Sequence, residues 1–385
     1  MFKVTFSVCR IRCLLRTRSA GSVSSNQPDC RIGGNGFLRS RWWCGWGRCL
    51  FVSLCLCVGA NPVDAQLPGQ RTGEVIPRDV REMYDRGVRY LVQSQSDSGQ
   101  WESASHQGAG GTAMAVMAML ASGEDPNYGL YAGTIRRGLQ ALLRMQPADT
   151  GYFPTSMYHH GFAMLCLAEA YGAVDDRQWR GEELRPLGQA LELSVRAALT
   201  AQAGNEFGAW RYSPTSKDAD TSVSGAVLMG LLAARNAGIE VPDKDIDRAI
   251  AYFNSMTSDG GQVGYSGGMG GFGDSLARSS IACLVLAVAR RKDMPKYSAT
   301  LQYLVGNLEQ QPRSWPEYAR YYQSQALFQG DVDAWRRWND RLIEQLKQVQ
   351  LGDGRFKGQL GPVEDTSLSL LALALNFRFL PIYER

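Results

Sequence analysis

Apolar residues follow two patterns along the chain, and the two patterns alternate. Residues 84–92 place apolar and charged side chains on different sides of a helical turn, which is typical of a helix with one face in solvent. Other segments are rich in Ala, Gly and Ser and are apolar around much of the helix, so they have to be buried. Six segments follow this second pattern, at residues 111–120, 161–170, 221–234, 279–289, 318–328 and 366–375.

A short corner sequence recurs before the buried helices. In its clearest copy, RGVRYLVQSQSDSGQW at residues 86–101, an amphipathic helix is followed by Gln, a Gly-containing turn and an aromatic residue. The fourth copy lacks the Gln, and the fifth copy is degenerate. The closing aromatic residues recur about every 50 residues, the length of one helical hairpin. They are Trp101, Phe153, Trp210, Tyr265, Trp315 and Phe356.

The alternation of the two helix types predicts an all-α fold with two concentric layers. An open stack of repeats needs polar caps at its ends. The first and last repeats of this chain are no more polar than the middle ones, and six hairpins that close into a ring have no ends to cap. We therefore predict an (α/α)6 toroid over residues 81–385, with an inner apolar ring and an outer amphipathic ring, preceded by a linker at residues 66–80.

The corner sequence resembles the Gln-Trp repeat of squalene–hopene and oxidosqualene cyclases, in which Lys/Arg-Gly, an aromatic residue or Leu, Gln and Gly-x-Trp follow one another. The copy at residues 86–101 matches almost letter for letter. The resemblance implies prenyltransferase and squalene-oxidase-type repeats in an α/α toroid, an architecture shared with protein prenyltransferase β-subunits and complement thioester domains. Because the cyclases carry two barrels and this chain has the length for one, it implies a single-barrel relative with an apolar or isoprenoid ligand in its cavity.

The catalytic motif of those cyclases is Asp-x-Asp-Asp-Thr-Ala at the start of an inner helix, and this chain has KDADTS at residues 217–222. Asp220 matches the third Asp of the family motif, and Ala219 stands where the protonating Asp is expected, which argues against cyclase activity. Asp218 takes that role only if the loop is shifted. We keep Asp218 and Asp220 as catalytic candidates. The competing interpretation is that Asp220 caps the helix that follows it, because Asp-Thr-Ser recurs before another buried helix at residues 365–367.

Two adjacent histidines open the second buried helix. Consecutive residues point to different faces of a helix, so we expect at most one of them to reach the cavity. His160 is a catalytic candidate and His159 a ligand-binding candidate. The chain has no His-Glu-x-x-His sequence, no zinc-type Cys spacing and no match to the Cys ligand of the prenyltransferases. We therefore predict no metal and no cofactor.

The remaining ligand-binding candidates lie near the starts of buried helices and in the aromatic fifth repeat. The hollow inside a ring of helices is the default ligand site. Tyr321 and Tyr322 lie on neighbouring faces of one helix, so we expect one of them to reach the hollow. The full set is His159, Trp210, Tyr212, Arg278, Tyr318, Tyr321, Tyr322 and Asp365.

A Gly-rich segment at residues 267–273 contains a formal Gly-x-Gly-x-x-Gly. The dinucleotide fingerprint requires a preceding strand, whereas this segment joins two helices, so we expect no phosphate site. We expect a loop over the mouth of the ring, of a length that suits a lid.

The N-terminal region differs from the rest in charge and cysteine content. Residues 1–65 hold nine of the 41 basic residues and two of the 37 acidic residues, so the rest is weakly acidic and has no electrostatic footprint for nucleic acid. The apolar run at residues 50–60 predicts a signal peptide with cleavage near Ala65 and export to the periplasm or beyond. It is shorter than the ~20 residues that a membrane span needs. No later segment reads as a membrane span, while peripheral membrane contact stays open.

Three functions fit these patterns. The first is a squalene-cyclase-like protein that binds an apolar or isoprenoid ligand. The second is a polysaccharide lyase or hydrolase, which needs a polar cleft with carboxylates, or with Arg and Tyr. The third is a non-catalytic interaction module that binds a protein partner at the rim of the ring. The sequence leaves the substrate and the oligomeric state open.

Overall fold

The chain divides into two units, Met1–Arg71 and Thr72–Arg385, and every residue described below belongs to the second. The predicted signal peptide, the cleavage site at Ala65 and most of the Gly-rich segment lie outside the described residues. In the computed structural model the described residues are 76–101, 108–179, 184–266, 271–273, 275–377 and 380–383.

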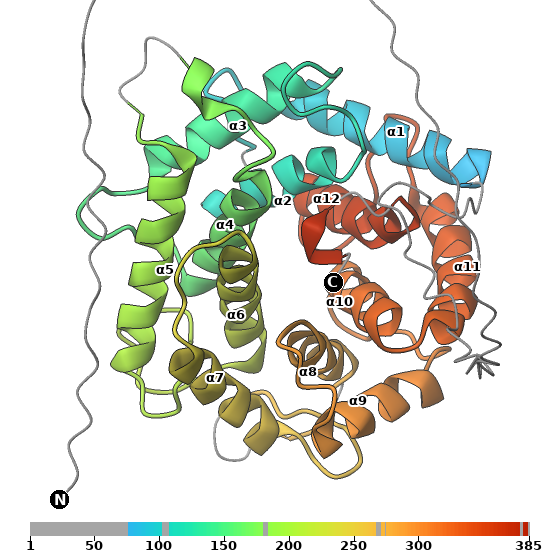
Figure 1. Ribbon diagram of the computed structural model, residues 1–385. Helices are drawn as coiled ribbons and strands as arrows, with labels where there is room; N and C mark the ends of the chain where they lie inside the picture. Colours follow the sequence, from blue (N-terminus) through green and yellow to red (C-terminus); the bar gives the residue numbers. More distant parts are fainter. Residues whose placement is uncertain are drawn as a thin grey trace, which may run out of the picture. The chain divides into compact units, whose positions relative to one another are not determined.

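Twelve α-helices make up the described part of the second unit, and they alternate between an outer and an inner ring (Figure 1). The outer helices are α1 (Arg78–Ser94), α3 (Ala132–Met145), α5 (Leu187–Ala203), α7 (Asp243–Met256), α9 (Pro295–Gly306) and α11 (Val332–Val349). The inner helices are α2 (Ala109–Leu120), α4 (Met157–Ala170), α6 (Thr221–Asn236), α8 (Leu276–Val288), α10 (Pro316–Gly330) and α12 (Pro362–Leu373). Short 3-10 turns lie at Asp176–Gln178, Ala374–Asn376 and Pro381–Tyr383.

The inner ring is closed. Each inner helix contacts the next one, and α12 contacts α2. The residues of α2 are all buried, whereas α1 buries one face only. Within the described ranges the β-structure consists of isolated bridges, and none of the helices is long and apolar enough to cross a membrane. The predicted all-α (α/α)6 toroid with an apolar inner ring is confirmed.

The recurring Gln has a structural role at the corner of its repeat. Its amide nitrogen donates to the carbonyl of the turn glycine and to a carbonyl near the start of the next outer helix, at 2.7–3.0 Å. In the last repeat Gln350 donates to the carbonyl of Met83 in α1, which ties the end of the ring to its beginning. The four residues that bond in this way are Gln95, Gln146, Gln202 and Gln350.

In four of the corners the turn glycine lies against the backbone of the next outer helix; these are Gly99, Gly151, Gly261 and Gly354. Gly354 has φ +95°, and a Cβ there would overlap the carbonyl oxygen of Arg86 in α1. Gly352 in the same loop has open space around its Cβ position. A corner of this kind therefore accepts only glycine at the position of Gly354.

We expect Gly354→Ala to lower the free energy of unfolding by about 2–4 kcal/mol, because it adds a left-handed backbone strain to a backbone clash. Urea unfolding followed by circular dichroism measures this loss. Gly352→Ala is the matched control and should change stability little. Equal stability of the two variants would contradict the proposed role of the corner.

Candidate functional site

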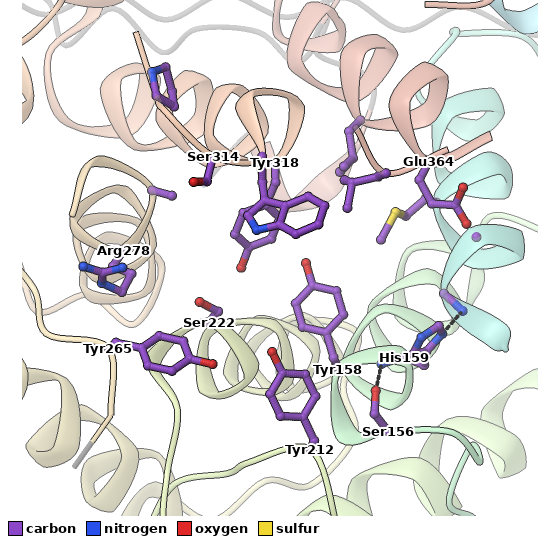
Figure 2. Close-up of a pocket in the computed structure, with 18 residues that line it drawn as sticks. Ser156, Tyr158, His159, Tyr212, Ser222, Tyr265, Arg278, Ser314, Tyr318 and Glu364 are labelled. Atoms are coloured by element: carbon purple, nitrogen blue, oxygen red, sulfur yellow. Dashed lines mark hydrogen bonds between the residues drawn. The ribbon is translucent and has the colours of Figure 1, made fainter. Parts of the chain in front are cut away.

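A cavity of about 480 Å³ lies at the N-terminal ends of the inner helices (Figure 2). Every inner helix contributes to its wall from its first two turns, and the loops before these helices complete it. The contributions of the helices are Gly110, Gly111, Met114, Tyr158, His159, Ser222, Ala277, Arg278, Tyr318, Glu364 and Leu368. The loops add Ser156, Tyr212, Tyr265, Pro312, Ser314, Trp315 and Leu360.

Four tyrosine hydroxyl groups converge on the space inside the cavity. Figure 2 shows Tyr318 above and Tyr158, Tyr212 and Tyr265 below, all with their hydroxyls turned toward the same space. Tyr318 is 9% exposed, and its hydroxyl is buried beside the hydroxyls of Tyr158 and Ser222. Burial, together with the neighbouring tyrosines, raises the pKa of Tyr158 and of Tyr318 well above its usual range. These hydroxyls therefore stay neutral and can both donate and accept hydrogen bonds.

Aromatic side chains close the cavity from below. Tyr321 and Tyr322 are buried, with ring centroids 4.7 Å apart, and Tyr322 lies 4.9 Å from Tyr318. Phe162 packs against Tyr321 at 6.1 Å. We expected Tyr321 or Tyr322 to reach the ligand. The structure places both of them in the floor beneath Tyr318, and neither lines the cavity.

The two adjacent histidines lie in different places. His159 lines the cavity, and its Nδ1 accepts a hydrogen bond from the N–H of Gly110 at 3.1 Å. A ring nitrogen that accepts leaves the ring proton of the neutral form on Nε2. Ser156 caps the start of α4 by accepting from the N–H of His159.

His160 points into the core instead. Its Nδ1 accepts from the N–H of Phe153 at 3.2 Å, and its Nε2 lies 3.0 Å from the carbonyl of Ser194. Burial lowers the pKa of His160 to about 4. In other repeats a hydroxyl accepts from the same corner N–H, as Thr112 does for Trp101. The geometry therefore explains His160 as a corner residue and does not bring it to the cavity as a catalytic candidate.

The two aspartates of the KDADTS sequence do not reach the cavity either. Asp218 is half-exposed and forms an ion pair with Arg211 at 2.6 Å. Asp220 is fully buried, and its Oδ1 accepts from the N–H groups of Ser222 and Val223 at 2.7 and 3.0 Å. This is the capping arrangement that competed with a catalytic role. Burial raises the pKa of Tyr265, and a hydrogen bond between the Tyr265 hydroxyl and Asp220 and the charge of Asp220 add to the rise.

Two further candidates serve the loops around the cavity. Trp210 is buried, and its indole N–H donates to the carbonyl of Ala198 at 2.9 Å, so it is a corner residue. Arg278 lines the cavity, but its guanidinium donates to the carbonyls of Val263 and Gly273 at 2.9 and 2.6 Å. Arg278 therefore ties Val263 and Gly273 to the start of α8.

Acidic side chains gather at the starts of α10 and α12. Glu364 lines the cavity, while Asp365 and Glu317 are buried behind the wall. Asp365 accepts from the N–H groups of Leu360 and Gly361 at 3.0 and 3.1 Å. Burial raises the pKa of Asp365 to about 6 against the effect of these hydrogen bonds, and the charge of Glu317 adds to the rise. Among the described residues, no group of three or more His, Cys, Asp or Glu side chains could hold a metal ion.

Trp315 stands at the rim of the cavity in an unusual backbone conformation. It is 47% exposed and has φ 50° and ψ 57°, a left-handed conformation that a residue with a side chain rarely adopts. Its N–H donates to the side-chain oxygen of Gln359 at 3.1 Å. Backbone strain of this kind is concentrated at functional sites.

Four of the residues predicted from the sequence therefore lie on the cavity wall, and other wall residues were not predicted. His159, Tyr212, Arg278 and Tyr318 line the cavity. The missed residues include Tyr265 and Glu364. Acidic residues are common in the first turn of a helix, so the sequence carried no signal that set Glu364 apart.

The chain was compared with known families, curated proteins and solved structures. No protein-family model matches it, and no curated protein matches it. The α-1,6-mannanase GH76A of Salegentibacter sp. HEL1_6 aligns with a TM-score of 0.59 and 9% identity over 77% of this chain and 99% of that one. That structure is an inactive variant with two consecutive aspartates replaced, in complex with α-1,6-mannotriose.

A second solved structure is similar over the same extent. The type II terpene cyclase MstE from Scytonema, in complex with its substrate geranylgeranyl dihydroxybenzoate, aligns with a TM-score of 0.54 and 15% identity over 78% of this chain and 98% of that one. The apo form of the same cyclase aligns with a TM-score of 0.53. At these identities the similarity establishes the α/α-toroid fold that this chain shares with both enzymes.

Proposed function

We propose that the cavity binds an oligosaccharide, and that the chain is a carbohydrate-active α/α toroid. The observation that carries this proposal is the convergence of four tyrosine hydroxyls on one space at the mouth of the ring. Neutral hydroxyl groups both donate and accept, so a wall of them suits a ligand whose own groups are hydroxyls. The mannanase of the same fold, solved with α-1,6-mannotriose, supports this choice of ligand.

The wall of the cavity combines polar groups with apolar surface. Ten of the 18 lining residues carry a polar side chain, among them three serines beside the tyrosines, while most of the wall surface is apolar. Small-molecule sites are lined in this way, mainly by apolar groups with a few placed polar ones. At the rim, the half-exposed rings of Trp315 and Tyr212 offer flat apolar surfaces next to hydroxyl groups, which matches a sugar ring with apolar faces and a polar edge.

The described wall of the cavity carries one carboxyl group, that of Glu364. Glycoside hydrolysis uses a pair of carboxyl groups, one as acid and one as base or nucleophile. Among the described residues that line the cavity, Glu364 is the one carboxylate. We therefore assign saccharide binding to the cavity. The single carboxyl group on the described wall, that of Glu364, favours the elimination reaction of a lyase, assisted by a tyrosine hydroxyl, over hydrolysis by a carboxyl pair.

We expect Tyr212→Phe to weaken saccharide binding about tenfold, which is about 1.4 kcal/mol, because Tyr212 lines the cavity, is half-exposed and would lose one hydrogen bond to the ligand. A glycan array that includes α-1,6-mannotriose would identify the best ligand, and calorimetry would then compare the variants. Tyr128→Phe is the matched control, since Tyr128 is 80% exposed and does not line the cavity. Unchanged affinity in Tyr212→Phe, or no binder on the array, would overturn the proposal.

A second candidate is the apolar or isoprenoid ligand implied by the cyclase-like repeats. Met114, Leu360 and Leu368 form an apolar part of the wall, and tyrosine rings can stabilise a carbocation through their π faces. The terpene cyclase of the same fold, solved with geranylgeranyl dihydroxybenzoate, supports it. Organic extraction of the purified protein followed by mass spectrometry would reveal a polyprenoid. Absence of such a lipid, with no binding of added geranylgeraniol, would exclude this alternative.

Export of the chain is part of the same proposal. An exported toroid would meet extracellular glycans directly. N-terminal sequencing of the protein recovered outside the cytoplasm should begin at Gln66, and an intact N-terminus would argue against processing near Ala65.

A further inference from the structure

Two buried carboxyl groups face each other beneath the rim of the cavity. Glu317 lies in the first turn of α10 and is 3% exposed, and Asp365 lies in the first turn of α12 and is 2% exposed. One side-chain oxygen of Glu317 is buried with no hydrogen-bond partner among the described residues. Neither residue lines the cavity itself.

The distance between the two carboxyl groups follows from the glycine that covers them. A Cβ at Gly358 would lie 2.5 Å from the carboxyl carbon of Asp365 and 2.5 Å from that of Glu317. The two carboxyl carbons therefore lie within twice that distance of each other. Two ionised carboxylates at this range, away from water, repel strongly, and one of them is expected to stay protonated.

Few other charges face the pair. On α10, burial lowers the pKa of the Arg320 guanidinium, while the charge of Glu317 raises it. No ion pair joins Arg320 to Glu317 among the described residues, and Arg320 Nε is buried there without a hydrogen-bond partner. On α12, Glu364 adds a third negative charge. Burial and the charge of Glu317 raise the pKa of Asp365 to about 6, although three backbone N–H groups oppose the rise. From α1, Tyr90 lies near Glu364 and Arg355.

The segment that covers the pair also builds the cavity. Residues 358–361, here termed the cover segment, donate two N–H groups to Asp365 from Leu360 and Gly361. Leu360 lines the cavity. Gln359 accepts the N–H of Trp315 and so helps to hold that residue in its left-handed conformation at the rim. The carboxyl pair, the cover segment and the rim are thus one connected structure.

We propose that Asp365, facing the carboxyl group of Glu317, holds a proton, and that this proton keeps the cover segment and Trp315 in the positions that form the cavity wall. Glu317 and Asp365 are then positioning residues for the ligand site. Loss of the proton leaves two carboxylates under one exposed glycine, and the repulsion is relieved when the cover segment lifts and admits water. Trp315 loses its Gln359 contact in the same step. The expected effect of this movement on ligand binding rests on the proposed function, whereas the pH-dependent movement of Trp315 itself does not.

The experiment follows Trp315 as a function of pH. The fluorescence of Trp315→Phe is subtracted from that of the full chain between pH 4 and pH 8, which isolates the signal of Trp315. We expect one transition with a midpoint near the pKa of about 6 of Asp365. In Glu317→Gln, with the same subtraction, the midpoint should move toward 3.8, the ordinary value for an aspartate, because the neighbouring charge is gone.

Asp333→Asn is the matched control, because Asp333 is an exposed first-turn acid of α11 paired with Arg336. Its midpoint should equal that of the unmodified chain. A transition with the same midpoint in Glu317→Gln, or a Trp315 signal that does not depend on pH, would overturn the inference. Saccharide affinity, measured at pH 5 and pH 7.5, tests the proposed function separately from the movement of Trp315. If no saccharide binds at either pH, the proposed function is wrong, and the Trp315 transition alone decides the present inference.

Discussion

Replacing Gly161 by Ala is expected to lower the free energy of unfolding by about 3 kcal/mol, because the added methyl group would force two inner helices apart. A Cβ at Gly161 in α4 would lie 2.6 Å from the carbonyl carbon of Ala226 and 2.7 Å from the nitrogen of Val227 in α6. These are backbone atoms of a buried helix, so no side chain can rotate away. Close packing leaves no space to absorb a methyl group at such a contact.

The matched control is Gly133→Ala in the outer helix α3. Gly133 is exposed, and its Cβ would meet only the end of the Arg137 side chain at 3.8 Å. Alanine is the better helix former by about 1 kcal/mol, so this variant should be as stable as the original chain or more stable. Urea unfolding of both variants measures the difference. If Gly161→Ala is no less stable than Gly133→Ala, the inner ring is packed less closely than the structure indicates.

Acid should destabilise the protein through His160, by about 3 kcal/mol between pH 7 and pH 4. The pKa of His160 is lowered from 6.5 to about 4 because the ring is fully buried. In the unfolded chain the ring takes up a proton as the pH falls through 6.5, whereas the folded protein resists until about 4. The unfolded state therefore binds more protons across this window, and stability falls as the pH falls.

His160→Asn isolates this effect. The amide oxygen of Asn can accept from the N–H of Phe153, as His160 does, but the side chain does not titrate. We expect the variant to be less stable at pH 7 by about 1–3 kcal/mol, since the bond to Ser194 is lost, and to lose much less stability on acidification. Urea unfolding at pH 7, 5.5 and 4.5 tests this. Parallel pH profiles for the two proteins would show that His160 does not carry the acid sensitivity.

Asp365 changes the stability of the protein with pH in the opposite direction to His160, over an overlapping range of pH. Its pKa is raised from 3.8 to about 6 in the folded protein, mainly by burial. Between these values the folded state holds the proton more tightly than the unfolded state, so this group lowers stability as the pH rises. Because Asp365 is present in both proteins, the difference between the original chain and His160→Asn removes its contribution.

The local pattern of the chain was sufficient to predict the two rings. Whether a helix is inner or outer depends on how much of its surface is apolar, and that property is visible in residues such as 84–92 and 111–120. Capping is also local. Asp220 bonds to N–H groups two and three residues further along the chain, so its capping role could be read from its place before a helix.

Which inner-helix residues meet the cavity was decided by the tertiary structure. A helix that is apolar all round carries no stripe to mark the side facing the hollow, so the sequence could not distinguish Tyr318, which lines the cavity, from Tyr321 and Tyr322, which form its floor. The carboxyl pair of Glu317 and Asp365 joins two helices through a third segment. Such a pairing depends on how the ring closes, because residues far apart in sequence approach each other only once the repeats have packed.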